Sequence, residues 1–215
     1  MPCNSQRGSN TNECISDTVN SPDISICTFE QQLADIIGRP TALRPFVCSG
    51  SPLACRVFIV GLNPASPMKA TFWDFWRPGI GYDKGAWMDA YLAERAGRPL
   101  KPGRIRRSRI SPSRAVIECL VEEIDPAICL ETNIYATPTE EFCDLGAELR
   151  DTKPFDYLLA TLKPEVIIVH GKDAVAHMQN KASAATVLPV PHFSRGWSHE
   201  QAREVGREVR QKLGG

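Results

Sequence analysis

An asparagine directly follows a short apolar stretch in the first third of the chain. Residues 57–60 are rich in β-branched side chains and are followed by Gly61, which is typical of a strand buried on both faces of a parallel sheet. The next residues, Leu62-Asn63-Pro64, form a turn signal. Ligands of open α/β sheets bind beyond the carboxyl ends of strands, so Asn63 stands where chemistry tends to occur. The alternative is an asparagine that only caps a turn.

Two other polar residues follow predicted strands. Asn133 lies near the end of a strand predicted over 127–135, and His192 follows a shorter strand over 185–191 that Pro189 interrupts. An amide offers a donor and an acceptor, and an imidazole can donate, accept or carry a proton. Each has a structural alternative: Asn133 could satisfy backbone groups of its own strand, and His192 could make a hydrogen bond within its loop.

Two local clusters stand out against the average composition. Residues 71–76 hold four aromatic side chains in a chain that is 7% aromatic, which favours either core packing or a stacking wall for a flat ligand. The second cluster is basic and contains no acid; it is either a solvated loop or a phosphate-binding surface. Its members are Arg95, Arg98, Lys101, Arg104, Arg106, Arg107, Arg109 and Arg114.

Helices and strands alternate along the chain, and these elements must position the polar groups. Besides the strands above, residues 165–170 predict a fourth, and helices are predicted over 28–37, 84–96, 111–124, 155–162, 172–178 and 198–213. The pattern predicts an α/β fold, a three-layer α/β/α sandwich with a mostly parallel four-stranded central sheet. We expect residues 27–215 to form a single domain and the polar residues 1–26 to form a flexible N-terminal tail.

Composition limits the classes of function. The formal net charge is zero, so any affinity for nucleic acid must come from a local patch. No run of 18 apolar residues or signal peptide is evident, so we expect a cytoplasmic protein with no membrane partner. The eight cysteines include no closely spaced pair, so we expect neither a disulfide framework nor a metal or other cofactor.

Three stretches together resemble the uracil-DNA glycosylase superfamily over about residues 45–200. Gly61-Leu62-Asn63-Pro64 is similar to the Gly-x-Asn-Pro motif of its mismatch-specific and single-strand-selective branches. Asn133 stands where the superfamily often places an asparagine that reads the base, and His192-Phe193-Ser194 resembles the His-Pro-Ser motif of the DNA-inserting loop. Each motif alone is weak, but their order and separation fit that fold.

The resemblance implies a monofunctional, base-flipping glycosylase that removes uracil from DNA without a cofactor, as a monomer. His192 would stabilise the departing base and Asn63 would hold the attacking water, with Asp74 or Glu131 as alternative activating groups. Asn133, Leu62 and Ala65 would contact the base, and Phe75 would stack on it, with Phe72, Trp73 and Trp76 as alternatives. DNA contacts would come from Ser66, Ser194, Arg195, Trp197, Arg104, Arg106 and Arg107.

Two departures from the family pattern matter for the expected substrate. Ala65 stands where strict uracil enzymes have a tyrosine that blocks the methyl group of thymine, so larger or damaged pyrimidines in DNA are also expected substrates. Phe193 replaces the proline of the His-Pro-Ser motif, and Arg195 or Trp197 could fill the space that a flipped base leaves. Rival interpretations are a binding protein on the same fold that does not cleave, and an enzyme acting on small nucleosides.

Overall fold

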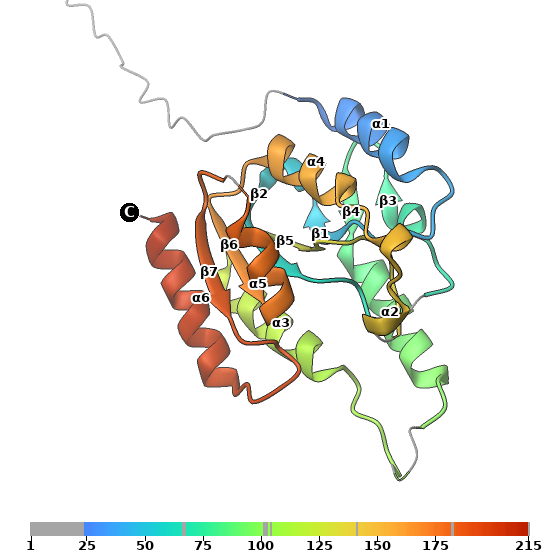
Figure 1. The fold of residues 1–215 in the computed structure, drawn as a ribbon, viewed down its shortest axis with the longest axis vertical. Helices are drawn as coiled ribbons and strands as arrows, with labels where there is room; N and C mark the ends of the chain where they lie inside the picture. The colour runs from blue at the N-terminus through green and yellow to red at the C-terminus, as the bar shows by residue number, and fades with distance from the viewer. Residues whose placement is uncertain are drawn as a thin grey trace, which may run out of the picture.

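The computed structural model describes residues 24–65, 68–100, 103, 105–140, 142–181 and 183–214. These residues form an α/β fold with one mixed sheet and helices on both of its faces (Figure 1). The helices are α1 Ile26–Ile37, α2 Lys84–Gly97, α3 Pro112–Ile124, α4 Lys153–Leu162, α5 Lys172–Gln179 and α6 His199–Leu213. The strands are β1 Phe46–Gly50, β2 Cys55–Gly61, β3 Trp76–Arg77, β4 Gly81–Asp83, β5 Ile128–Asn133, β6 Val166–His170 and β7 Thr186–Val190.

The sheet differs from the expected one in strand number and direction. It has seven strands in the order β3-β4-β1-β5-β2-β6-β7. The four predicted strands, β5, β2, β6 and β7, lie side by side and run parallel, whereas β1, β4 and β3 extend the sheet through antiparallel pairings. The expectation of a four-stranded, mostly parallel sheet is therefore wrong. The added strands are short and lie in segments rich in glycine and proline, a composition that favours loops.

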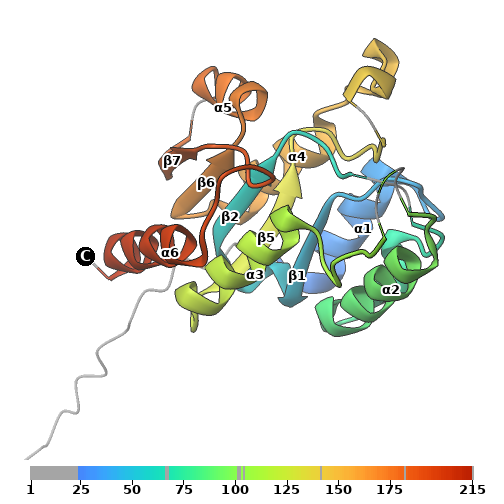
Figure 2. The same ribbon diagram turned by 90° about the horizontal axis from the view of Figure 1, so that it is seen from below.

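The alternation of side chains along β2 explains why the sheet is covered on both faces. Val57 and Ile59 point to one face and pack with apolar residues of α3 and α6. Phe58 and Val60 point to the other face and pack with α1, α4 and α5. Figure 2 shows α3 and α6 on one side of the sheet and α4 and α5 across it. A strand buried on both faces has to be apolar throughout, which is the pattern of residues 57–60.

The first helix begins earlier than the sequence indicates. The sequence predicts a capping box starting at Thr28, but the N-cap is Ser25, whose Oγ accepts the backbone N–H of Thr28. Ile24 and Ile26 pack against the core, so the ordered domain already includes the last residues of the expected tail. The other residues of that tail, 1–23, lie outside the described residues. No α-helix in the described part of the chain has the length and apolarity needed to cross a bilayer.

The carboxyl ends of three parallel strands meet at one edge of the sheet. Gly61 at the end of β2 is paired with Asn133 at the end of β5, and Val60 is paired with Val169, next to the end of β6. The chain leaves β2 and reaches β5 through α3 on one face, and it leaves β5 for β6 through α4 on the other. Such a reversal opens a crevice at the strand ends, where ligands of α/β folds bind.

Candidate functional site

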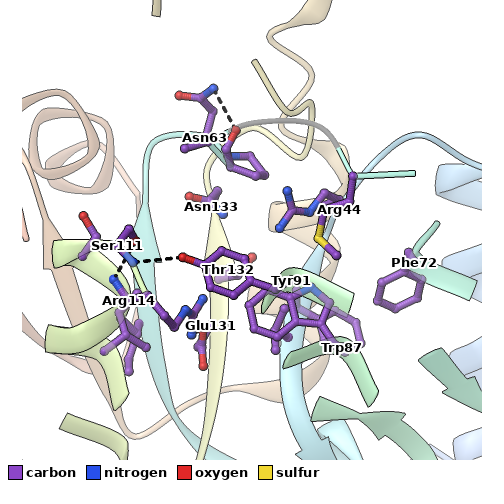
Figure 3. A pocket seen from close by; sticks show the side chains of 18 of the residues that line it. Arg44, Asn63, Phe72, Trp87, Tyr91, Ser111, Arg114, Glu131, Thr132 and Asn133 are labelled. Atoms are coloured by element: carbon purple, nitrogen blue, oxygen red, sulfur yellow. Dashed lines mark hydrogen bonds and ion pairs between the residues drawn. The ribbon is translucent and has the colours of Figure 1, made fainter. Parts of the chain in front are cut away.

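A cavity of about 200 Å³ lies at this edge of the sheet. Five of the residues predicted for the site line it: Asn63, Ala65, Phe75, Asn133 and His192. They come from the turn after β2, the segment before β3, the end of β5 and the loop after β7. Figure 3 shows Asn63 at one end of the cavity, with Asn133 and Glu131 below it along β5. Residues far apart in the sequence thus surround one space.

The amide of Asn63 is oriented by the loop that faces it. Its Nδ2 donates to Thr139 Oγ1 at 2.8 Å and, more weakly, to the carbonyl of Pro64 at 3.5 Å (Figure 3 marks the second bond). A carbonyl can only accept, so the nitrogen must be on this side of the amide. Oδ1 is therefore turned the other way, as an acceptor.

The loop after β7 fixes the imidazole of His192. Its Nδ1 accepts the backbone N–H of Ser194 at 3.2 Å, and the Ser194 hydroxyl lies 2.7 Å from the same atom. Burial, and then the nearby charge of Arg195, lower the pKa of His192, which favours the neutral ring. A neutral ring that accepts at Nδ1 carries its hydrogen on Nε2. His192 is thus held as a hydrogen-bond donor through Nε2.

Phe193 shows how this loop is anchored without the proline of the motif. Its side chain is fully buried and stacks on the ring of His170 at 4.2 Å between centroids. Trp197 packs edge-on against Phe193, and its Nε1 donates to the carbonyl of Pro191. Burial of an aromatic ring therefore replaces the fixed φ of proline as the constraint. Trp197, predicted as one of two side chains that could fill the hole left by a flipped base, supports the loop in this structure.

His170, at the end of β6, also lines the cavity and is absent from the residues predicted for the site. Its ring stacks on Phe193 and meets His192 edge to face, with centroids 5.1 Å apart. Burial, and then His192, lower the pKa of His170 to about 3, so the ring is neutral. The sequence does carry a signal for it: His170 ends an apolar strand before a glycine, a pattern much like the one that marks Asn63.

Close packing over Gly61 explains why a glycine ends β2. A Cβ at this position would lie 2.6 Å from Oδ1 of Asn133 and 2.9 Å from Nε2 of His170, closer than such atoms can approach. Any larger residue would displace one or both polar groups. Gly61 therefore allows two strand-end side chains to converge above the backbone of a third strand.

The aromatic cluster divides between the cavity and the core. Phe72 and Phe75 line the cavity, together with Trp87 and Tyr91 of α2, which stack on each other with centroids 5.6 Å apart. Trp76 is buried against Phe29, and Trp73 donates from Nε1 to the carbonyl of Gly38. This leaves Phe72 and Phe75 as the two rings of residues 71–76 that face the cavity. Leu62, expected beside them, packs against the apolar core instead.

Both alternative carboxylates already have partners within the protein. Asp74 closes a capping box with Thr71, accepting its backbone N–H at 2.7 Å. Glu131 lines the cavity, but it is ion-paired with Lys84 at 2.9 Å and with Arg114. These cations hold the pKa of Glu131 below its usual range against the cost of burial, so its charge is already neutralised. Among the described residues, His, Cys, Asp and Glu do not gather in threes with metal-binding geometry.

The basic residues have different surroundings. Arg107, predicted to contact DNA, donates to the carbonyls of Arg95, Arg98 and Pro99 at the end of α2. Arg106 and Arg195 are exposed. Ser66 and Arg104, both predicted to contact DNA, lie outside the described residues.

Comparison with known proteins adds no assignment. No family model matches the sequence, and no curated protein matches it.

Proposed function

We propose that this protein is a DNA glycosylase that hydrolyses the N-glycosidic bond of uracil, acting on a nucleotide flipped out of the DNA. The observation that carries the proposal is the convergence of Asn63, Asn133 and His192 on one cavity that Phe75 also lines. Cleavage requires an acceptor for the flipped base, a donor for the departing anion and a placed water, and these residue types can supply all three.

His192 stabilises the leaving group in this proposal. When the bond between C1′ and N1 breaks, uracil departs with negative charge that reaches O2. The hydrogen on Nε2 of His192 is fixed before the reaction by the bonds at Nδ1, so no reorganisation is needed to donate to that oxygen. A neutral donor is sufficient, because the anion needs a hydrogen bond and not a full proton in the transition state.

Asn63 positions the water. Its Nδ2 is held by Thr139, which leaves Oδ1 as the acceptor for a water hydrogen. The water oxygen forms the new bond to C1′ while the bond to N1 breaks, and the water proton passes through solvent to the uracil anion. An amide cannot take that proton, so Asn63 orients the nucleophile without acting as a base. We expect slower turnover than with a carboxylate here.

Asn133 and Phe75 recognise the base. The carboxamide of Asn133 can accept the N3–H of uracil and donate to O4, and the ring of Phe75 offers a flat apolar surface for stacking. Ala65 is exposed at the rim of the cavity and has no bulk to exclude a substituent on the pyrimidine. Larger or damaged pyrimidines are therefore included in the proposed substrate class. Arg106 and Arg195 supply exposed charge for the DNA backbone.

The proposal is tested with purified protein and oligonucleotides that contain one uracil, single- or double-stranded, followed by alkali to cut abasic sites. We expect strand scission above the buffer control. His192→Ala should lower the single-turnover rate by about 10²–10³-fold, as loss of one anion-stabilising donor does in other enzymes. His199→Ala, a change of an exposed histidine at the start of α6, is the matched control and should keep the wild-type rate.

Two results would redirect the proposal. Tight binding of uracil-containing DNA with no scission in either strand context would indicate a binding protein on the same fold. Cleavage of free deoxyuridine without cleavage of DNA would indicate a nucleoside hydrolase.

A further inference from the structure

His170 faces the cavity but has no part in the hydrolysis described above. It is the last residue of β6, and its ring is held between two aromatic neighbours, Phe193 on its face and His192 at its edge. The interplanar angle to Phe193 is 23°, so the two rings are nearly parallel. These contacts fix the plane of the imidazole.

The fixed ring places Nε2 beside the carboxamide oxygen of Asn133. Both atoms lie within contact distance of the single point where a Cβ on Gly61 would stand, at 2.9 Å for His170 Nε2 and 2.6 Å for Asn133 Oδ1. The two groups are thus neighbours above the end of β2, on the cavity that Asn133 and His170 both line.

The other ring nitrogen decides which one carries the hydrogen. Nδ1 of His170 is buried and has no hydrogen-bond partner among the described residues. A buried N–H without an acceptor is rarer in proteins than a buried acceptor without a donor. The neutral ring therefore carries its hydrogen on Nε2. The result is a donor next to the acceptor of Asn133.

We propose that His170 is a specificity-determining residue whose Nε2–H binds O4 of uracil, an inference that rests on the proposed glycosylase function. The Watson–Crick edge of uracil presents an acceptor at O2, a donor at N3 and an acceptor at O4. His192 Nε2–H, Asn133 Oδ1 and His170 Nε2–H supply the complementary donor, acceptor and donor. Cytosine carries an amino group at position 4 and would set one N–H against another. A donor left unpaired in this way discriminates strongly between bases.

The test compares sulfur-substituted bases, because sulfur is a weaker acceptor than oxygen. Oligonucleotides carry uracil, 2-thiouracil or 4-thiouracil on a 2′-fluoroarabinose that resists cleavage, and their affinities are measured with wild-type protein and His170→Phe. The phenyl ring keeps the stacking on Phe193 and removes the donor. We expect wild type to bind uracil about tenfold more tightly than 4-thiouracil, and His170→Phe to retain only the smaller part of this preference that Asn133 supports through its own bond to O4. The preference for uracil over 2-thiouracil should be unchanged.

The matched control is His177→Phe. His177 lies on α5, and its ring meets the ring of Tyr135 edge to face. It should keep both preferences. A folded His170→Phe that retains the wild-type preference over 4-thiouracil overturns the inference, and so does an equal loss of both preferences, which would make His170 only a support for its neighbours. If His170→Phe does not fold, His170→Met gives the same comparison with another apolar side chain.

The outcomes separate this inference from the proposed function. Wild-type protein that excises uracil while His170→Phe keeps its preference over 4-thiouracil retains the glycosylase function and removes only the role of His170. Wild-type protein that neither binds nor excises uracil overturns both.

Discussion

Glu131 and Asn133 stand two residues apart on β5 and face the same cavity (Figure 3), yet one is surrounded by charged groups and the other by neutral ones. Glu131 lies in a cluster of charges with Lys84, Arg114 and Glu118. Asn133 lies in a neutral group with His170 and His192, the second of which is held as a donor by its own loop. We call the part of the cavity around Glu131 the ionic end and the part around Asn133 the neutral end. Both are polar, but only at the ionic end are the groups paired with one another.

The difference separates stability from recognition. Buried charges require partners, and once paired they have little capacity left for a ligand. Neutral amides and imidazoles tolerate partial burial with some of their hydrogen-bonding capacity unused. We therefore expect changes at the ionic end to affect unfolding and changes at the neutral end to affect binding and turnover.

The largest effect should come from the ionic end. Glu131→Gln leaves Lys84 and Arg114 with an excess of positive charge in a buried site, and we expect a loss of about 3–5 kcal/mol in the free energy of unfolding, measured with urea. Glu165→Gln is the matched control. Its partner Arg56 and Glu165 itself are each about two-fifths exposed, so that change should cost at most about 1 kcal/mol. Equal losses in the two variants would contradict the comparison.

The next effect should appear only in turnover. Asn63→Ala removes the acceptor for the attacking water, and we expect a single-turnover excision rate about 100-fold below wild type, with the urea midpoint little changed. Asn180→Ala, at the exposed end of α5, should leave the rate unchanged. A variant that loses stability and activity together would mean that Asn63 mainly holds the loop at Thr139.

Lowering the pH should reduce the free energy of unfolding through the neutral end and the ionic end in different pH ranges. His170 has a folded pKa of about 3, well below the 6.5 of an exposed histidine, so the unfolded chain binds its proton first. Stability from this residue is complete above about pH 6.5 and decreases as the pH falls towards 3. Between pH 7 and pH 5 the loss is about 2 kcal/mol. We expect urea titrations of His170→Phe to lack this part of the loss.

Glu131 should affect the free energy of unfolding at a lower pH than His170 does. Its folded pKa is below the usual 4.5, so its contribution is present at neutral pH and is lost only as the pH falls below about that value. The difference in stability between wild type and Glu131→Gln should therefore be constant from pH 7 to about pH 5 and shrink below it. A difference that already shrinks at pH 6 would assign the acid sensitivity to other groups.

Strand ends are the part of the site that the sequence predicts. An apolar run that stops at a polar residue marks both the strand and its carboxyl end, and this pattern locates Asn63, whereas Asn133 follows Glu131 and Thr132 and is singled out only by its place in a predicted strand and by the family resemblance. The same reasoning applies to His170, but a histidine after Val169 fits the plain end of a strand equally well, and no family motif singles it out. The partners of Glu131 could not be predicted, because Lys84 and Arg114 reach it from two different helices.

The strands β1, β4 and β3, which extend the sheet on one side, are harder to predict for a physical reason. Strands β3 and β4 are two and three residues long, too short for a periodic pattern, and β1 lies in a segment whose prolines and glycines indicate a loop. Strand β1 pairs with β5, β4 pairs with β1 and β3 pairs with β4, so their places in the sheet are set by tertiary packing. The basic segment shows the same limit: its charge is evident in the sequence, but the carbonyls that Arg107 meets at the end of α2 depend on how the chain turns.

Arg106 and Arg107 are adjacent residues of one type, so they can test the difference between an exposed arginine and one that is bonded to backbone carbonyls. Arg107→Ala removes hydrogen bonds to three carbonyls at the end of α2, and we expect a loss of about 1–2 kcal/mol in the free energy of unfolding. Arg106→Ala changes an exposed side chain and should cost less than about 0.5 kcal/mol. If Arg106 contacts a phosphate, its loss lowers the slope of log affinity against log salt by about one, as measured by DNA binding at several salt concentrations. Loss of slope in Arg107→Ala alone would reverse the assignment, because it would mean that the residue holding the helix end is also the one that meets the DNA.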